Sequence, residues 1–105
     1  MQRPVALALE LHRHGASFVV VGSAAAALRG EPARPADLDV VVHPDDAGDF
    51  VSALRELGGD LGLPRLRRCR DVHVDTAWGP LDVFLAAYPV DVPVRVGERA
   101  LRVAT

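Results

Sequence analysis

The 105-residue sequence contains no lysine, because all twelve of its basic residues are arginines. A Schiff-base lysine, a lysine that acts as a catalytic base and the lysine of a P-loop are therefore excluded. Any phosphate group that the protein binds must be contacted by arginine side chains or by backbone amides. The formal net charge of −2 gives no global electrostatic basis for nucleic-acid binding, which would require a local basic patch.

Cysteines and long apolar runs are scarce as well. Cys69 is the only cysteine, which excludes an internal disulfide and a cysteine-based zinc site; we expect its side chain to be buried or half-buried. No apolar run approaches the length of a membrane-spanning helix, and the first residues, MQRPVALALELHRHG, are too short and too interrupted for a signal peptide. We therefore expect a cytoplasmic protein without a membrane partner.

The chain shows no repeat, low-complexity tract or linker, and its length suits a single domain, residues 1–105, with a core of its own. Apolar runs and helical periodicity predict a small mixed β-sheet with helices packed on it, of α/β or α+β type. The predicted helices are 4–14, 24–29 and 44–57. The predicted strands are 18–21, 38–42, 72–76, 81–85 and 99–103, with a hairpin turn at AWGP, residues 77–80. Residues 60–71 carry no clear signal.

Two aspartates stand at the predicted strand 38–42. Because side chains alternate between the faces of a strand, Asp37 and Asp39 point to one face, while Leu38 and Val40 point to the core. Two neighbouring carboxylates repel each other unless a positive group lies between them. Mg²⁺ is a natural candidate, since it binds a few carboxylate oxygens and completes its shell with water and phosphate oxygens.

A third aspartate, Asp82, interrupts the apolar run LDVFLA. Burying a lone carboxylate is costly, so Asp82 needs a partner. If its strand lies beside strand 38–42, it joins Asp37 and Asp39, and three carboxylates can hold two metal ions roughly 3.5–4 Å apart. Asp75, on the preceding predicted strand, is an alternative third carboxylate.

Gly22 and Ser23 lie between the predicted strand 18–21 and the helix that follows it. A glycine lets the backbone approach a ligand closely, and free amides at the start of a helix favour an anion such as phosphate. A phosphate-binding turn that faces a carboxylate–metal centre is the arrangement that nucleotidyl transfer requires.

The segment VVVGSAAAALRGEPARPADLDVVV resembles the signature of the nucleotidyltransferase superfamily, often called the DNA polymerase β-like fold. That signature is an apolar strand, Gly-Gly or Gly-Ser, a spacer, and then Asp-x-Asp or Asp-x-Glu on the next strand. The triplet Leu81-Asp82-Val83 matches the family's third carboxylate, and Gly79 before it is familiar from small bacterial members. The resemblance covers roughly residues 15–90 and implies a small nucleotidyltransferase-like core.

The resemblance also implies a role for each matching residue. Gly22 and Ser23 would bind the triphosphate of an NTP, with ATP as the expected nucleotide, while Asp37 and Asp39 would hold Mg²⁺. Asp82 would help to hold the catalytic metal and assist deprotonation of an acceptor hydroxyl. The implied reaction is in-line attack on the α-phosphorus, which transfers a nucleoside monophosphate and releases pyrophosphate.

Arg34 stands in a place familiar from the family, where it could reach the triphosphate; a salt bridge within the loop is the equally weighted alternative. Many relatives carry a helical region after the sheet, which builds the base and acceptor pockets, and none follows the predicted strand 99–103. We therefore expect a minimal single-domain member, or one whose helical region is missing or is supplied by another chain. The acceptor (RNA, protein or small molecule) is open.

The alternative function is a non-catalytic module that binds a nucleotide or a partner protein in a two-component, toxin–antitoxin-like system. A homodimer that completes the site across subunits is a further possibility, since so small a sheet has exposed edges.

Three other features have competing interpretations. The arginine run at 65–70 is either a solvated sheet edge, which we favour, or a patch for an RNA or nucleotide acceptor. His73 is interpreted as a strand residue without a chemical role. Trp78, beside Gly79 and Pro80, is interpreted as a turn anchor in preference to a base-stacking platform.

Overall fold

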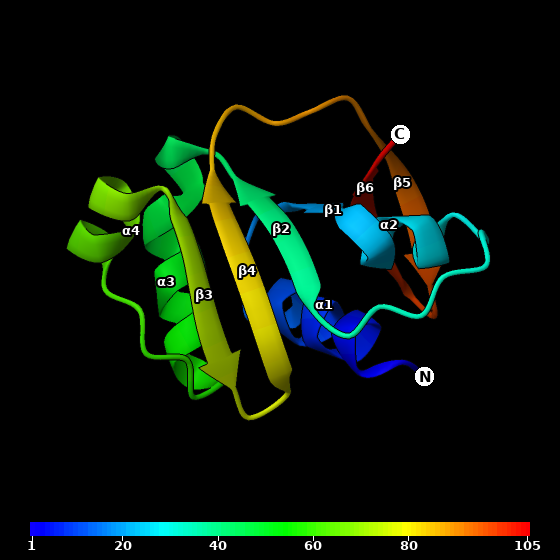
Figure 1. Cartoon of the computed structure of the whole chain (residues 1–105), viewed down its shortest axis with the longest axis horizontal. Helices are drawn as coiled ribbons and strands as arrows, with labels where there is room; N and C mark the ends of the chain where they lie inside the picture. The colour runs from blue at the N-terminus through cyan, green and yellow to red at the C-terminus, as the bar shows by residue number, and fades with distance from the viewer.

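The computed structural model describes residues 1–105 and shows a mixed sheet with helices packed on it, which confirms the predicted α+β class (Figure 1). The helices are α1 (Arg3–Arg13), α2 (Gly22–Leu28), α3 (Ala47–Glu56), which a 3₁₀ turn η1 (Pro44–Asp46) precedes, and α4 (Leu63–Cys69). The strands are β1 (Val19–Val21), β2 (Leu38–Val42), β3 (Asp71–Thr76), β4 (Gly79–Leu85), β5 (Asp91–Val96) and β6 (Arg99–Ala104). None of the helices has the length and apolar character needed to cross a bilayer.

The six strands lie in the order β3-β4-β2-β1-β6-β5. Strand β2 is parallel to β4 and antiparallel to β1, and the hairpins β3–β4 and β5–β6 are antiparallel. Because β1 and β2 run in opposite directions, the end of β1, where α2 begins, lies beside the start of β2. This topology brings Gly22 next to the aspartates of β2.

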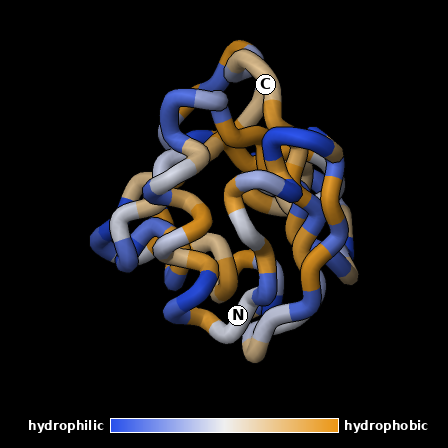
Figure 2. Tube along the Cα trace, turned by 90° about the vertical axis from the view of Figure 1, so that its left-hand side faces the viewer, coloured by the Kyte–Doolittle hydropathy of each residue, from blue (hydrophilic) through white to orange (hydrophobic).

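The hydrophobic core lies between the sheet and helices α1 and α3, which lie behind β2, β4 and β3 in Figure 1. Phe50 of α3 is fully buried, and its ring meets that of Phe18 edge to face, with the ring centroids 6.1 Å apart. The core side chains of β2 and β4 are Leu38, Val40, Val42, Leu81, Val83 and Leu85. In Figure 2 hydrophobic and hydrophilic residues alternate in short steps along the trace, as one-sided burial requires.

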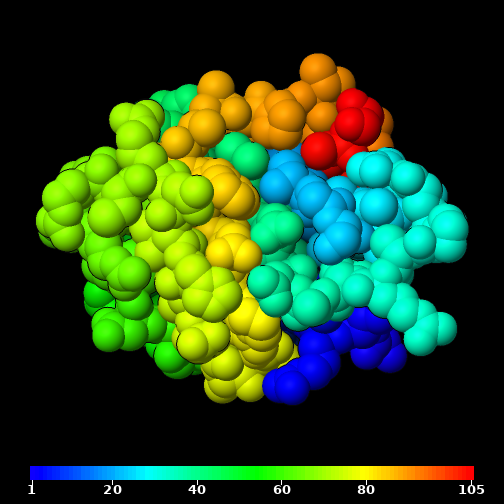
Figure 3. Space-filling model, viewed as in Figure 1, coloured from blue at the N-terminus to red at the C-terminus, as the bar shows by residue number.

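The other face of β3, β4 and β2 is open. Figure 3 shows atoms of all three strands at the surface of the molecule on this side. The residues that alternate with the core side chains, among them Asp39, His73 and Asp82, are exposed or half-buried. The polar face of this part of the sheet is therefore accessible to a ligand.

Two elements, α4 and β5, are not predicted from the sequence. Helix α4 lies within residues 60–71, where Leu66 is its only buried residue, so it lacks an apolar stripe. Strand β5 contains Pro93, which is tolerated because β5 is an edge strand.

The structure corrects one interpretation from the sequence in part and another in full. The arginines of the run are exposed and form no ion pair, as expected of solvated residues, but they lie in α4 and at the residue after it instead of at a sheet edge: Arg65, Arg67, Arg68 and Arg70. Cys69, at the end of the same short helix, is exposed instead of buried or half-buried. A helix with a single buried residue leaves nearly all of its other side chains in solvent.

Candidate metal and phosphate site

The register of β2 and β4 places Asp39 directly beside Asp82 on the open face of the sheet. The condition under which Asp82 can join the aspartates of β2, that the two strands are neighbours, is thereby met. Asp75 pairs with Pro80 at the far end of the β3–β4 hairpin, and its side chain is 88% exposed. Asp82, and not Asp75, is the carboxylate that lies beside Asp39.

The Asp39 carboxyl is held in an unfavourable electrostatic environment. Partial burial, a hydrogen bond with Asp82 and repulsion by Asp82 and Asp37 raise its pKa from 3.8 to about 6. Burial penalises the charged form, and the neighbouring negative charges add to that penalty. A proton or a cation at this position would relieve the repulsion between the carboxylates.

Asp37 lies one residue before β2 and is half-buried. One ligand atom from each of Asp37, His73 and Asp82 lies within 4.8 Å of the other two. Asp39, with its carboxylate against Gly22, borders this group. The predicted set of Asp37, Asp39 and Asp82 is therefore brought together, and a histidine is added to it.

His73 is the residue of this site that sequence reasoning misses. Its Nδ1 lies 2.9 Å from Oδ1 of Asp82, and its Nε2 lies 3.4 Å from Oδ1 of Asp75. The hydrogen bond with Asp82 is the main reason that the pKa of the imidazole is raised above 6.5. The predicted hairpin could have revealed it, because a turn that pairs Thr76 with Gly79 also pairs His73 with Asp82.

Gly22 closes the site on the other side of Asp39, because Val21 pairs with Asp39 across β1 and β2. Its φ angle is +68°, and a Cβ atom at this position would lie only 2.5 Å from Oδ2 of Asp39. Both the backbone conformation and the close approach therefore require glycine. Ser23 follows in the first turn of α2 and is exposed.

Arg34 stands in the exposed loop before β2 and forms no ion pair, so the salt bridge considered from the sequence is not formed. Its guanidinium is available to an anionic ligand. The structure gives no contact between Arg34 and the carboxylates of the site.

The side chains present fit a divalent cation. Carboxylate oxygens suit Mg²⁺, which keeps water or phosphate oxygens in the rest of its shell, and the open face leaves room for these. The imidazole of His73 would be acceptable to Mn²⁺ or Zn²⁺ as well, since nitrogen ligands suit transition metals. No family model, curated protein or solved structure matches this chain.

Proposed function

We propose that this chain is a nucleotidyltransferase that uses a divalent cation, Mg²⁺ in the first instance, to transfer a nucleoside monophosphate from an NTP to an acceptor hydroxyl. The main support is the position of Asp39, which has Asp82 on one side and a glycine that tolerates no side chain on the other. A metal–phosphate complex needs carboxylates that bind the metal and, next to them, a stretch of backbone that no side chain covers. The resemblance of the Gly-Ser and Asp-x-Asp motifs to the nucleotidyltransferase superfamily supports the same proposal.

Each residue of the site has a task in this proposal. Asp37, Asp39 and Asp82 hold the cations, which when bound neutralise phosphate charge and polarise the α-phosphorus. Gly22 leaves room for phosphate oxygens, and the Ser23 hydroxyl donates a hydrogen bond to one of them. Asp82 accepts the proton of the acceptor hydroxyl, and His73, 2.9 Å away, orients the Asp82 carboxylate.

ATP is the NTP that we propose as donor, with pyrophosphate as the leaving group. The acceptor is an RNA, a protein or a small alcohol. A cytoplasmic location belongs to the proposal, because that compartment supplies NTPs and Mg²⁺. Arg34, exposed and without an ion pair, contacts the triphosphate in this proposal.

A transfer assay tests the proposal. Purified protein is incubated with labelled NTPs, Mg²⁺ or Mn²⁺, and candidate acceptors, among them RNA, aminoglycosides, small alcohols and the protein itself. We expect labelled product from the wild type and from Asp75→Asn, a control that removes an exposed carboxylate outside the proposed ligand set. The double variant Asp37→Asn with Asp39→Asn should form none. Label transfer that survives the double variant, or no transfer to any acceptor, would count against the proposed activity.

The open face of β3, β4 and β2 favours a second candidate, a module on which a partner chain or a second copy covers the site. In that case partner binding would survive Asp37→Ala combined with Asp39→Ala, while the wild type would show no transfer. Sedimentation measurements with and without a candidate partner distinguish the two functions.

A further inference from the structure

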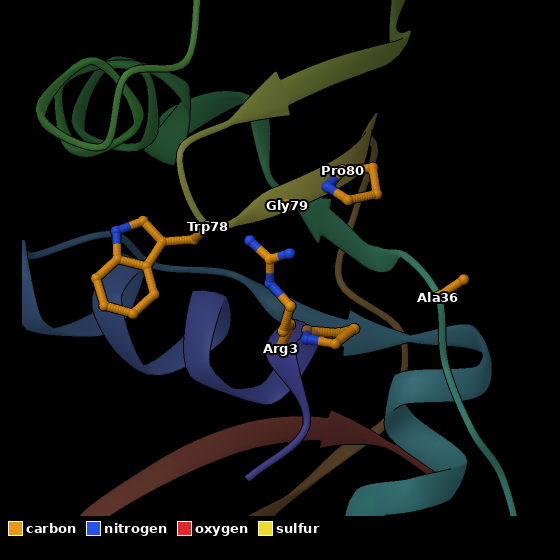
Figure 4. Close-up of a pocket in the computed structure, with 6 residues that line it drawn as sticks. Arg3, Ala36, Trp78, Gly79 and Pro80 are labelled. Atoms are coloured by element: carbon orange, nitrogen blue, oxygen red, sulfur yellow. The ribbon is translucent and has the colours of Figure 1, made fainter.

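A small pocket opens where β2 and β4 begin, next to the proposed metal centre. Its volume is about 90 Å³, and it is lined by Arg3, Pro4, Ala36, Trp78, Gly79 and Pro80 (Figure 4). Ala36 directly precedes Asp37, and Pro80 lies on the same face of β4 as Asp82, about 7 Å along the strand at roughly 3.3 Å per residue. The pocket therefore lies near the carboxylate site, at the same end of β2 and β4 as Asp37.

Trp78 is presented to solvent by a turn whose backbone is fixed. Trp78, interpreted from the sequence as a turn anchor in preference to a base-stacking platform, is 39% exposed. The backbone N–H of Trp78 donates to Oγ1 of Thr76 at 3.0 Å, and this hydroxyl donates to the carbonyl of Gly79 at 2.8 Å. A large aromatic ring on a rigid turn loses little entropy when a planar ligand stacks on it.

Arg3 supplies the polar group of the pocket. Its guanidinium points toward the turn that carries Trp78 (Figure 4), and it forms neither an ion pair nor a side-chain hydrogen bond. No carboxylate lines the pocket. The donors of the guanidinium are therefore available to acceptor atoms of a ligand.

The size of the pocket limits what it can hold. Pockets that enclose a whole small molecule measure roughly 300–1,000 Å³, so this pocket accepts a single ring system at one end of a longer substrate. A nucleobase fits this description, since it has a flat face for the indole and acceptor atoms on its edge for the guanidinium.

We propose that this pocket is a nucleobase subsite, in which Trp78 stacks on the base and Arg3 donates hydrogen bonds to its edge. The inference rests on the proposed function, which places the phosphates at Gly22 and the aspartates; Ala36, at the edge of the pocket, is the residue before Asp37. The base belongs either to the incoming NTP or to the terminal nucleotide of an RNA acceptor.

Trp78 is the only tryptophan of the chain, so its fluorescence reports on the pocket in the unmodified protein. The protein with Mg²⁺ is titrated with a non-hydrolysable ATP analogue, with inorganic tripolyphosphate, which has phosphates but no base, and with a short RNA oligonucleotide. We expect the analogue to change the fluorescence in a saturable way, and tripolyphosphate to leave it unchanged. A change with RNA and not with the analogue would assign the subsite to the acceptor base.

Calorimetry with variants gives a second readout. Trp78→Leu should weaken binding of the analogue by roughly 10-fold, since base stacking on an aromatic ring is lost, and should leave tripolyphosphate binding unchanged. Trp78→Phe, which keeps an aromatic ring, should weaken binding of the analogue less than Trp78→Leu does. Arg3→Ala should also weaken binding of the analogue, whereas Arg95→Ala, which removes an exposed arginine of β5, should not.

The outcomes separate the subsite from the proposed function. If the analogue and tripolyphosphate bind equally well, and neither the analogue nor RNA alters Trp78 fluorescence, the nucleobase subsite is refuted while the phosphate–metal site stands. If neither the analogue nor tripolyphosphate binds, the proposed function fails, and the subsite fails with it.

Discussion

Replacing Asp39 by asparagine is expected to stabilise the fold in metal-free solution while weakening the proposed metal site. The pKa of this carboxyl rises from 3.8 to about 6 on folding, because of burial and the neighbouring Asp82 and Asp37. The folded chain thus holds the proton more tightly than the unfolded chain. The protonated Asp39 carboxyl therefore stabilises the fold relative to the ionised one. This stabilisation is fully present below pH 3.8 and is lost as the pH rises through about 6.

The expected gain follows from these two pKa values. Their difference corresponds to about 3 kcal/mol for a fully shielded group. Asp39 is only half-buried and solvent screens its charge, so the gain at neutral pH should be nearer ~1 kcal/mol. In a domain of this size that raises the unfolding midpoint by about 5 °C. Asparagine has the same shape, so packing against Gly22 is preserved.

Thermal and urea unfolding of the wild type and Asp39→Asn in chelator measure this difference. The advantage of the variant should be largest near ~pH 7 and shrink toward ~pH 5, where the wild-type carboxyl becomes protonated. Saturating Mg²⁺ with a non-hydrolysable NTP should stabilise the wild type more than the variant. The difference in stability between the two proteins should therefore shrink or change sign. Asp75→Asn should change stability by less than about 0.5 kcal/mol. If the variant is less stable than the wild type in chelator at neutral pH, the ionised Asp39 carboxylate does not destabilise the fold and the prediction is wrong.

Two other positions give predictions that do not depend on turnover. Gly22→Ala should lower the free energy of unfolding in urea by at least ~1 kcal/mol more than Gly97→Ala, because both glycines have a positive φ but only a Cβ at Gly22 would collide with Asp39. Equal losses for the two variants would mean that the chain relaxes away from Asp39 without cost. In an NMR titration the imidazole of His73 should show a pKa above 6.5, and Asp82→Asn should lower it, because Asp82 is the main cause of the rise. An unchanged His73 titration in Asp82→Asn would contradict the contact.

Local periodicity is sufficient to predict the part of the site that lies on single strands. The run Leu38–Val42 forms a strand with the predicted bounds, and its alternating burial puts Asp39 on the open face. Asp82 is recognisable because it is the one charged residue in an apolar run. These signals come from neighbours in the chain, so tertiary structure does not alter them.

The rest depends on contacts between distant residues. His73 gains its role only because β3 pairs with β4 in a register that puts it opposite Asp82. Strand β5 alternates Val92, Val94 and Val96, but Pro93 weakens the signal until the edge position of the strand is known. Helix α4 buries only Leu66, so its sequence lacks the helical spacing of apolar residues that would predict it. The pocket at Trp78 likewise forms only because the β3–β4 turn and the start of α1, which are distant in the sequence, lie side by side.

A crystal structure with Mn²⁺ and a non-hydrolysable ATP analogue would show whether the carboxylates bind a metal–nucleotide complex. Mn²⁺ occupies the kind of site that Mg²⁺ does, and its anomalous scattering locates it. We expect an anomalous peak within coordination distance of Asp37, Asp39 and Asp82, with the phosphates against Gly22 and Ser23. Mn²⁺ bound elsewhere, or phosphates held away from the Gly22–Ser23 turn, would contradict it.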